Sequence, residues 1–177
     1  MKGRIEIVAS GFGGQGVVRL GQVLGEAAVK QGLHVTMLKS HGTEMRGGYV
    51  RSQVVLSGET IDSPMCESPD FLITLSSAAY ERFKGTVPDY GTIVYDPAFV
   101  EKIDTSLPCL QRALPAKELS MTNFGKPMFS NSIALGAMAK LLQKDLDKDH
   151  VLESILVVLP RFKEENKKAF QIGFDHF

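Results

Sequence analysis

Three glycines near the N-terminus are the residues whose type and spacing could do chemistry. Gly11, Gly13 and Gly16 fit the pattern G-x-G-x-x-G, in which a tight turn brings backbone N–H groups close to phosphates. The amides at a helix start also lack partners, and with the helix dipole they favour an anion. The candidate ligand-contacting residues are Gly11, Phe12, Gly13, Gly14, Gln15 and Gly16. The alternative is that these glycines only let a helix pack tightly on the first strand.

The acidic residue that an NAD site expects is missing. In NAD-binding proteins a carboxylate follows the glycine turn by about 20 residues, at the end of the second strand. Here the predicted second strand, residues 34–38, is followed by Lys39, Ser40 and His41. The sequence therefore disfavours ordinary NAD binding.

No catalytic or metal-binding constellation stands out in the sequence. The four histidines are scattered without the spacing of zinc ligands, no lysine follows the glycine turn as in a Walker A motif, and no G-x-S-x-G is present. Asp62 and Asp96 fall in turns, where capping explains an acid. Cys66 and Cys109 are too few for an iron–sulfur cluster, which needs about four thiolates. We expect no catalytic and no metal-binding residues in this chain, which points to a subunit.

The elements around the glycine turn predict an α/β domain. An apolar run over residues 5–9 predicts a strand, and residues 17–31 show the apolar spacing of a helix. Further strands are expected at residues 49–56, 70–75, 91–95 and, weakly, 109–113, the first of them at an edge of the sheet. Helices are expected at residues 76–83, 131–141, 150–159 and 162–177, the first capped by Ser76 or Ser77 and the second by Ser130 or Asn131. Asn166 shares the apolar face of the last helix, which favours a buried, hydrogen-bonded amide. We expect a single Rossmann-like domain over residues 1–177, with a mostly parallel sheet, helices on both faces and a helical C-terminal third.

Charge and hydropathy give no sign of a nucleic-acid or membrane partner. Twenty basic and twenty acidic side chains give a formal net charge of zero, and no run approaches the ~20 apolar residues of a membrane span. Two cysteines without a CxxC, and no secretory signal, favour a reduced, cytoplasmic protein.

The segment from Ser40 to Gly48 (SHGTEMRGG) collects three glycines, one acid and one base. Such loops often carry recognition, although an ordinary surface loop remains the alternative. Because glycines raise the entropy cost of ordering a loop, contacts with another subunit are expected to supply that order. We therefore place Glu44 and Arg46 at a subunit contact. The competing interpretation is a local surface ion pair between them.

Taken together, the motifs resemble the gamma subunit of 2-oxoacid:ferredoxin oxidoreductases, the pyruvate/ketoisovalerate oxidoreductase family. The matching segments are residues 11–16, 41–48, 61–64, 70–75, 131–136 and 166–173. Two segments depart from the family pattern. Thr43 replaces a usual proline, and Tyr49-Val50-Arg51 follows the paired glycines where many members have small residues.

The resemblance implies a role in the oxidative decarboxylation of a 2-oxo acid to acyl-CoA, carbon dioxide and reduced ferredoxin, in an enzyme that is not active through this chain alone. Thiamine diphosphate, Mg and [4Fe-4S] clusters are then held by alpha and beta subunits and a ferredoxin-like delta subunit, with coenzyme A as co-substrate and ferredoxin as acceptor. This chain binds no cofactor tightly and helps to shape the coenzyme A side of the site. The expected interface residues are His41, Glu44, Arg46, Gly47, Gly48 and Asn131.

Two other functions remain open at this point. One is a stand-alone nucleotide- or coenzyme A-binding module. The other is the related indolepyruvate oxidoreductase beta subunit, which usually has Gln where this chain has Met45.

Overall fold

The computed structural model describes residues 3–41 and 49–177 of the chain. Within these residues the strands form one six-stranded sheet in the order β2-β3-β1-β4-β5-β6. The strands are β1 (Arg4–Phe12), β2 (His34–His41), β3 (Tyr49–Ser57), β4 (Phe71–Thr74), β5 (Thr92–Tyr95) and β6 (Leu110–Ala113).

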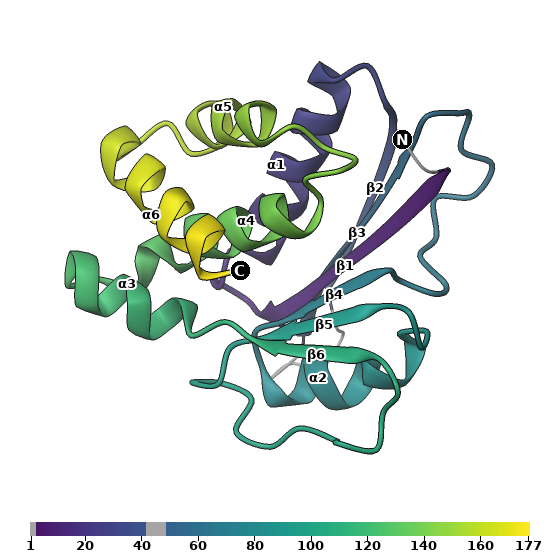
Figure 1. Cartoon of the computed structure of the whole chain (residues 1–177), viewed down its shortest axis with the longest axis horizontal. Helices are drawn as coiled ribbons and strands as arrows, with labels where there is room; N and C mark the ends of the chain where they lie inside the picture. The colour runs from purple at the N-terminus through teal and green to yellow at the C-terminus, as the bar shows by residue number, and fades with distance from the viewer. Residues whose placement is uncertain (1–2, 42–48) are drawn as a thin grey trace.

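Helices cover both faces of this sheet (Figure 1). The helices are α1 (Val17–Lys30), α2 (Ser77–Phe83), α3 (Ala116–Phe124), α4 (Ser130–Leu141), α5 (Lys148–Val158) and α6 (Lys163–His176), with short 3-10 helices η1 (Lys84–Thr86) and η2 (Pro127–Phe129). Helices α1, α4, α5 and α6 lie on one face, and α2 lies on the other. The predicted fold class is confirmed: an α/β fold with a mostly parallel sheet and a helical C-terminal third.

Strand β3 corrects the prediction of an edge strand at residues 49–56. It lies between β1 and β2 and pairs antiparallel with both, whereas β1, β4, β5 and β6 pair in parallel. The physical reason is its burial, because the run Val54–Leu56 is fully covered. An edge strand would leave that apolar run and its backbone groups open to another chain.

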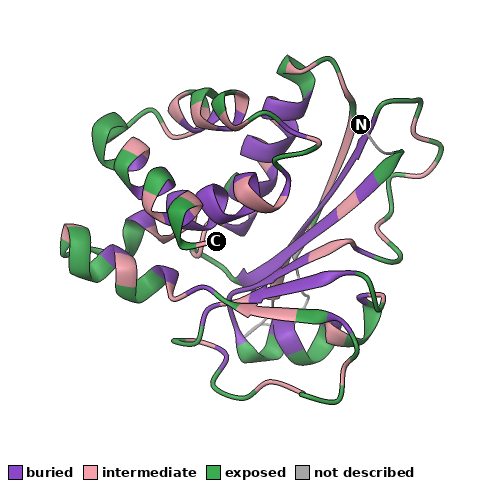
Figure 2. Ribbon diagram, in the orientation of Figure 1, coloured by how far each residue is buried: buried purple, intermediate pink, exposed green. Residues whose placement is uncertain are grey.

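The core lies mainly between the sheet and the larger helical layer (Figure 2). Helix α1 places Val17, Leu20 and Leu24 against the strands. A smaller core under α2 joins Leu72, Tyr80 and other residues. Ser76 caps α2 by accepting a hydrogen bond from the Ala79 amide (3.1 Å), as the sequence predicted.

Helices α4 and α6 touch each other through their backbones. A Cβ on Gly173 would lie 2.6 Å from the carbonyl carbon of Ile133, and one on Gly136 would lie 2.7 Å from the Phe174 amide nitrogen. Two glycines facing the partner helix therefore set the separation of these helices.

Asn131 does not cap α4, and neither does Ser130. The helix begins at Ser130 and no side chain caps it, because η2 runs directly into it and Phe129 already has helical dihedral angles. A side-chain cap needs an extended residue before the first turn. Asn131 therefore lies in the first turn of α4, and its carboxamide is left for another role.

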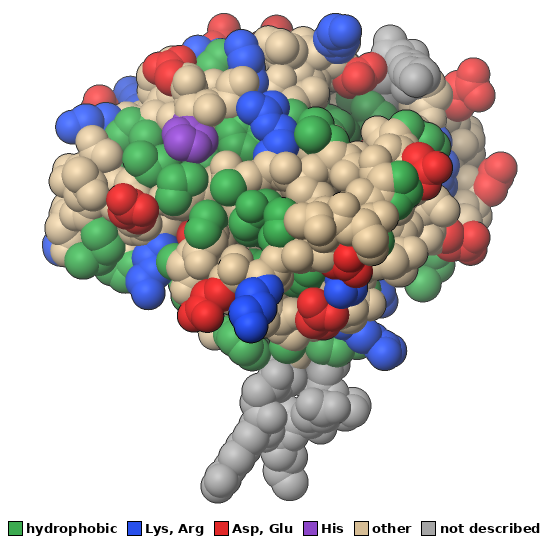
Figure 3. All heavy atoms as spheres, turned by 60° about the horizontal axis from the view of Figure 1, so that its bottom comes forward, with side chains coloured by type: hydrophobic (Ala, Val, Ile, Leu, Met, Phe, Trp, Pro, Cys, Tyr) green, Lys and Arg blue, Asp and Glu red, His purple; other side chains and the backbone are tan. Residues whose placement is uncertain are grey.

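Acidic and basic side chains are interspersed over the face in Figure 3, with apolar patches between them. None of the helices in the described ranges has the length and apolar character needed to cross a membrane.

Candidate functional site

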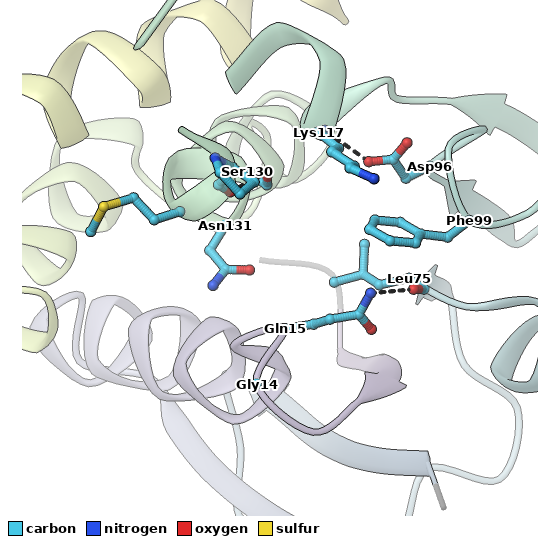
Figure 4. A pocket seen from close by; sticks show the side chains of 10 residues that line it. Gly14, Gln15, Leu75, Asp96, Phe99, Lys117, Ser130 and Asn131 are labelled. Atoms are coloured by element: carbon cyan, nitrogen blue, oxygen red, sulfur yellow. Dashed lines mark hydrogen bonds between the residues drawn. The ribbon is translucent and has the colours of Figure 1, made fainter. Parts of the chain in front are cut away.

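A cavity of about 530 Å³ opens beyond the carboxyl ends of the parallel strands. The chain leaves β1 through α1 toward β2 and β3 on one side, whereas β4 and β5 lie on the other side. Open α/β sheets bind ligands at such a topological switch point. The lining residues are Gly14, Gln15, Leu75, Asp96, Phe99, Lys117, Pro127, Met128, Ser130 and Asn131, most of them labelled in Figure 4.

The side chain of Gln15 links the glycine turn to the end of β4 by hydrogen bonds. Its Oε1 accepts a hydrogen bond from the Phe12 amide (2.6 Å), and its Nε2 donates to the carbonyl oxygen of Leu75 (2.7 Å). The side chain thus bridges the gap where β1 and β4 diverge (Figure 4). The floor of the cavity is therefore held in place by the protein itself.

Internal packing requires two of the three motif glycines. A Cβ on Gly11 would collide with the Gln15 carboxamide and lie 3.0 Å from the Leu75 Cβ. A Cβ on Gly16 would lie 2.7 Å from the Asn131 Cγ, and Gly16 also has a left-handed φ of 74°. Gly13 has no atom within 4 Å of its ideal Cβ position. The turn therefore presents Gly14, at φ 89°, and Gln15 to the cavity.

The carboxamide of Asn131 faces the cavity from α4 (Figure 4). It packs against Gly16 at the start of α1, where no side chain caps the helix. The side chain of Asn131 forms no hydrogen bond with any other described residue. It therefore offers both donors and an acceptor to a ligand beside an uncapped helix start.

Asp96 and Lys117 form the opposite wall (Figure 4). Asp96 is 2% exposed, and its carboxylate accepts hydrogen bonds from the amides of Ala98 and Lys117 (2.9 Å each). Burial raises the pKa of Asp96, while those two amides oppose the shift. Through its bond with the Lys117 amide, Asp96 fixes the start of α3.

Among the described lining residues of this cavity, Lys117 supplies the cationic group. It lies 5.1 Å from the centre of the Phe99 ring, and it is exposed at the cavity mouth. Lys117 makes no ion pair with another described residue. The Asn131 carboxamide and the Lys117 ammonium group suit an anionic ligand. Leu75, Phe99 and Met128 supply apolar walls, which suit a ligand that also has an apolar portion.

The structure brings some of the sequence-predicted residues together and separates others. Gly14, Gln15 and Asn131 share the cavity, whereas Phe12 is exposed outside it. His41 ends β2. The remaining predicted interface residues, Glu44, Arg46, Gly47 and Gly48, lie outside the described residues.

Sequence reasoning missed several lining residues. Leu75 and Asp96 directly follow β4 and β5, so their place after two parallel strands was a usable signal. Phe99, Lys117 and Met128 come from separate segments, and no local pattern marks them.

The fold and cavity define a class: an open α/β protein with a cavity at the switch point, where the described lining residues include no nucleophile–base pair. The family model described as pyruvate ferredoxin/flavodoxin oxidoreductase matches residues 6–176. This chain therefore belongs to the pyruvate ferredoxin/flavodoxin oxidoreductase family, and the resemblance predicted from its motifs is confirmed.

Relatives agree with this assignment over nearly the whole chain. A 2-oxoglutarate synthase subunit KorC of Archaeoglobus fulgidus is 35% identical over 177 residues, covering 99% of this chain and 89% of the relative. The solved gamma subunit of a keto/oxoacid ferredoxin oxidoreductase from Geobacter sulfurreducens has a TM-score of 0.85 at 29% identity, covering 97% of this chain and 96% of that one.

The fold also occurs as part of a longer chain. The solved 2-oxoglutarate:ferredoxin oxidoreductase from Magnetococcus marinus, with 2-oxoglutarate, coenzyme A and succinyl-CoA bound, has a TM-score of 0.87 at 24% identity. That likeness covers 99% of this chain and 31% of the other. The KorC relative and the Geobacter protein are thus subunits by name, and the same fold occurs within the longer Magnetococcus chain.

Proposed function

We propose that this chain is the gamma subunit of a multi-subunit 2-oxoacid:ferredoxin oxidoreductase. The enzyme converts a 2-oxo acid, coenzyme A and oxidised ferredoxin into acyl-CoA, carbon dioxide and reduced ferredoxin. The substrate is pyruvate, 2-oxoglutarate or a branched-chain 2-oxo acid. The chain has two cysteines, too few for a cluster with about four thiolate ligands. As the family resemblance implies, the alpha, beta and delta subunits would hold the iron–sulfur clusters, Mg and thiamine diphosphate.

The contribution of this chain is the coenzyme A side of the site. The observation that carries this proposal is the cavity at the switch point, whose wall holds the Asn131 carboxamide without an internal partner. Coenzyme A combines phosphates with an amide-rich chain, and the cavity offers a cation, amide donors and apolar walls for them. The uncapped start of α1 adds a favourable field for phosphate.

Asn131→Ala in the assembled enzyme tests this role. The change removes hydrogen bonds to the ligand and none within the described protein, so the subunit should keep its stability. Loss of one such bond predicts a KM for coenzyme A raised about 3- to 10-fold, with the KM for the 2-oxo acid unchanged.

The matched control is Asn123→Ala, because Asn123 is exposed on α3 and bonds only to the Leu119 carbonyl (2.9 Å). A KM for coenzyme A that stays at the parent value in Asn131→Ala contradicts the proposed site. If less enzyme assembles at the same time, Asn131 acts at a subunit interface instead.

Co-purification with the tagged chain tests the subunit assignment itself. Thiamine diphosphate-binding and ferredoxin-like chains should accompany it in stoichiometric amounts. A chain that purifies alone, yet still binds coenzyme A, would be a stand-alone binding module.

A further inference from the structure

The two edge strands of the sheet differ in how well they are protected against pairing with another chain. Strand β6 is four residues long and lies between Pro108 and Pro115, and short strands and prolines discourage such pairing. Strand β2 runs over eight residues, His34–His41, contains no proline, and pairs with β3 in an unbroken register. Within the described ranges no strand pairs with its other side. The outer edge of β2 is therefore open to an additional strand.

A groove of about 690 Å³ lies beside this open edge. It lies on the face of the sheet that α1 and α5 cover (Figure 1). Two of its residues, Val29 on α1 and Val157 on α5, are each 60% exposed. An exposed apolar surface next to an unpaired strand edge is typical of a protein–protein contact. The apolar lining consists of Val29, Val35, Met37, Val157, Val158 and Pro160.

Two side chains of opposite charge flank this edge without a partner. Glu26 lines the groove from α1, and the preceding Gly25 packs over Val35, since its ideal Cβ lies 3.5 Å from the Val35 Cγ1. Lys39 is exposed and shares the groove face of β2 with Val35 and Met37, because side chains alternate along a strand. Neither Glu26 nor Lys39 forms an ion pair with a described residue. Each charge is therefore available to another molecule.

These features become complementary when two β2 strands pair antiparallel about a two-fold axis perpendicular to the sheet. Such an axis keeps each side chain on its own face, so the groove faces of the two copies join. With Met37 on the axis, Lys39 of one copy lies opposite Val35 of the other, beside that copy's Glu26. The symmetry produces this contact twice. With Leu38 on the axis, Lys39 would lie opposite Met37 and farther from Glu26, so the charges favour the first register.

We propose that the outer edge of β2 pairs antiparallel with β2 of a second copy of this chain, with Met37 on the two-fold axis. Main-chain hydrogen bonds join the two sheets into one, the apolar grooves meet on one face, and each Lys39 pairs with Glu26 of the second copy. The contact goes beyond the proposed function, because it does not involve the cavity at the switch point. It places two copies of this chain side by side in one assembly.

A charge exchange tests the pairing of Lys39 with Glu26. Lys39→Glu and Glu26→Lys each place like charges together, so each should raise the dissociation constant of the dimer of the full chain at least tenfold. The double variant restores opposite charges and should restore the affinity. Lys144→Glu, at an exposed lysine outside the groove, is the matched control and should leave the affinity unchanged. Sedimentation equilibrium measures all four variants.

A cysteine placed on the two-fold axis tests the register in the assembled enzyme. Directly opposed residues of antiparallel strands have Cβ atoms about 4.5–5.5 Å apart, close to the separation that a disulfide spans. Met37→Cys should therefore link two copies of this chain under mild oxidation, as seen on a non-reducing gel. Leu110→Cys, on the opposite edge strand and 56% exposed, should not link.

Several outcomes would overturn the inference. A full chain that stays monomeric, together with Met37→Cys that does not link in the assembled enzyme, excludes a dimer through β2. A link from Met37→Cys to a different subunit shows that another chain occupies this edge. A link through Leu38→Cys in place of Met37→Cys refutes the register, and a double variant no tighter than the single ones refutes the pairing of Lys39 with Glu26.

Discussion

Alanine substitutions at glycines that face a neighbouring helix or strand should raise the free energy of unfolding at some positions and lower it at others. The sign depends on which atoms the new Cβ contacts. In a helix, Gly→Ala alone stabilises by about 1 kcal/mol. At Gly173 the new Cβ would lie 2.6 Å from the Ile133 carbonyl carbon, whereas carbon atoms pack at about 3.5–4.0 Å. Helices α4 and α6 would have to separate by about 1 Å, since the contact is with backbone and no side chain can turn away.

The expected cost at Gly173 exceeds the helix gain. Overpacking of a well-packed core costs about 1–3 kcal/mol, and a backbone contact belongs at the upper end. After the gain in helix propensity is subtracted, Gly173→Ala should lower the free energy of unfolding by about 2 kcal/mol. For a chain of 177 residues this is a fall in Tm of about 4–8 °C.

Gly25→Ala is the matched control. Its Cβ would lie 3.5 Å from the Val35 Cγ1, an ordinary contact, so the variant should gain about 0.5–1 kcal/mol. The change in stability of Gly21→Ala should fall between those of Gly173→Ala and Gly25→Ala. Its new Cβ would meet the Ser52 hydroxyl and lie 3.0 Å from the Met37 Cε, and both are side-chain ends that can move.

Urea titration followed by circular dichroism measures the series. The reasoning is refuted if Gly173→Ala is as stable as the parent chain, or if Gly25→Ala loses as much as Gly173→Ala. An unchanged m-value is needed to attribute the differences to the folded state.

Two further predictions concern titratable groups. Burial raises the pKa of Asp96, so its contribution to stability is complete at low pH and declines as pH rises through the raised pKa of the folded state. Asp96→Asn, which cannot ionise and loses one amide contact, should be less stable by about 1–3 kcal/mol at pH 4 and by less at pH 7; a deficit that grows with pH would contradict this. Burial and the nearby Glu6 raise the pKa of the Cys66 thiol to about 12, which leaves about a thousandth of the thiolate that a free cysteine has at pH 8. Alkylation of Cys66 by iodoacetamide, followed by peptide mass spectrometry, should therefore be about a thousandfold slower in the folded chain than in urea, and comparable rates would disprove the burial argument.

Local patterns in the sequence predicted the helices and strands well where the residues of a single segment determine its structure. The strand, glycine turn and helix from Arg4 to Lys30 follow from periodicity and glycine spacing, and Asn166 was predicted as a buried, hydrogen-bonded amide because it shares an apolar helix face. Strand β3 was misplaced at an edge, because its partners β1 and β2 lie before it in the chain and partial alternation says nothing of which strands flank it.

The candidate site was only partly predictable for the same reason. Gly14 and Gln15 are found through their motif, but their neighbours in the cavity, Lys117 and Met128, come from α3 and η2 and become neighbours only on folding. Asn131 was expected as a helix cap, and the run of η2 into α4 frees it to face the cavity.

The strand order has a consequence during synthesis. Strand β1 is made first, yet it pairs with β3 and β4, the second of which ends at Thr74. At about 5–20 residues per second, the residues between Phe12 and Thr74 take about 3–12 s to appear. During that interval Ile5, Ile7 and Ala9 lack at least one of the strands that bury them, and α1 is the first element able to shield them. Slow decoding between β3 and β4 would lengthen the exposure of the apolar residues of β1 on the ribosome, and fast decoding would shorten it.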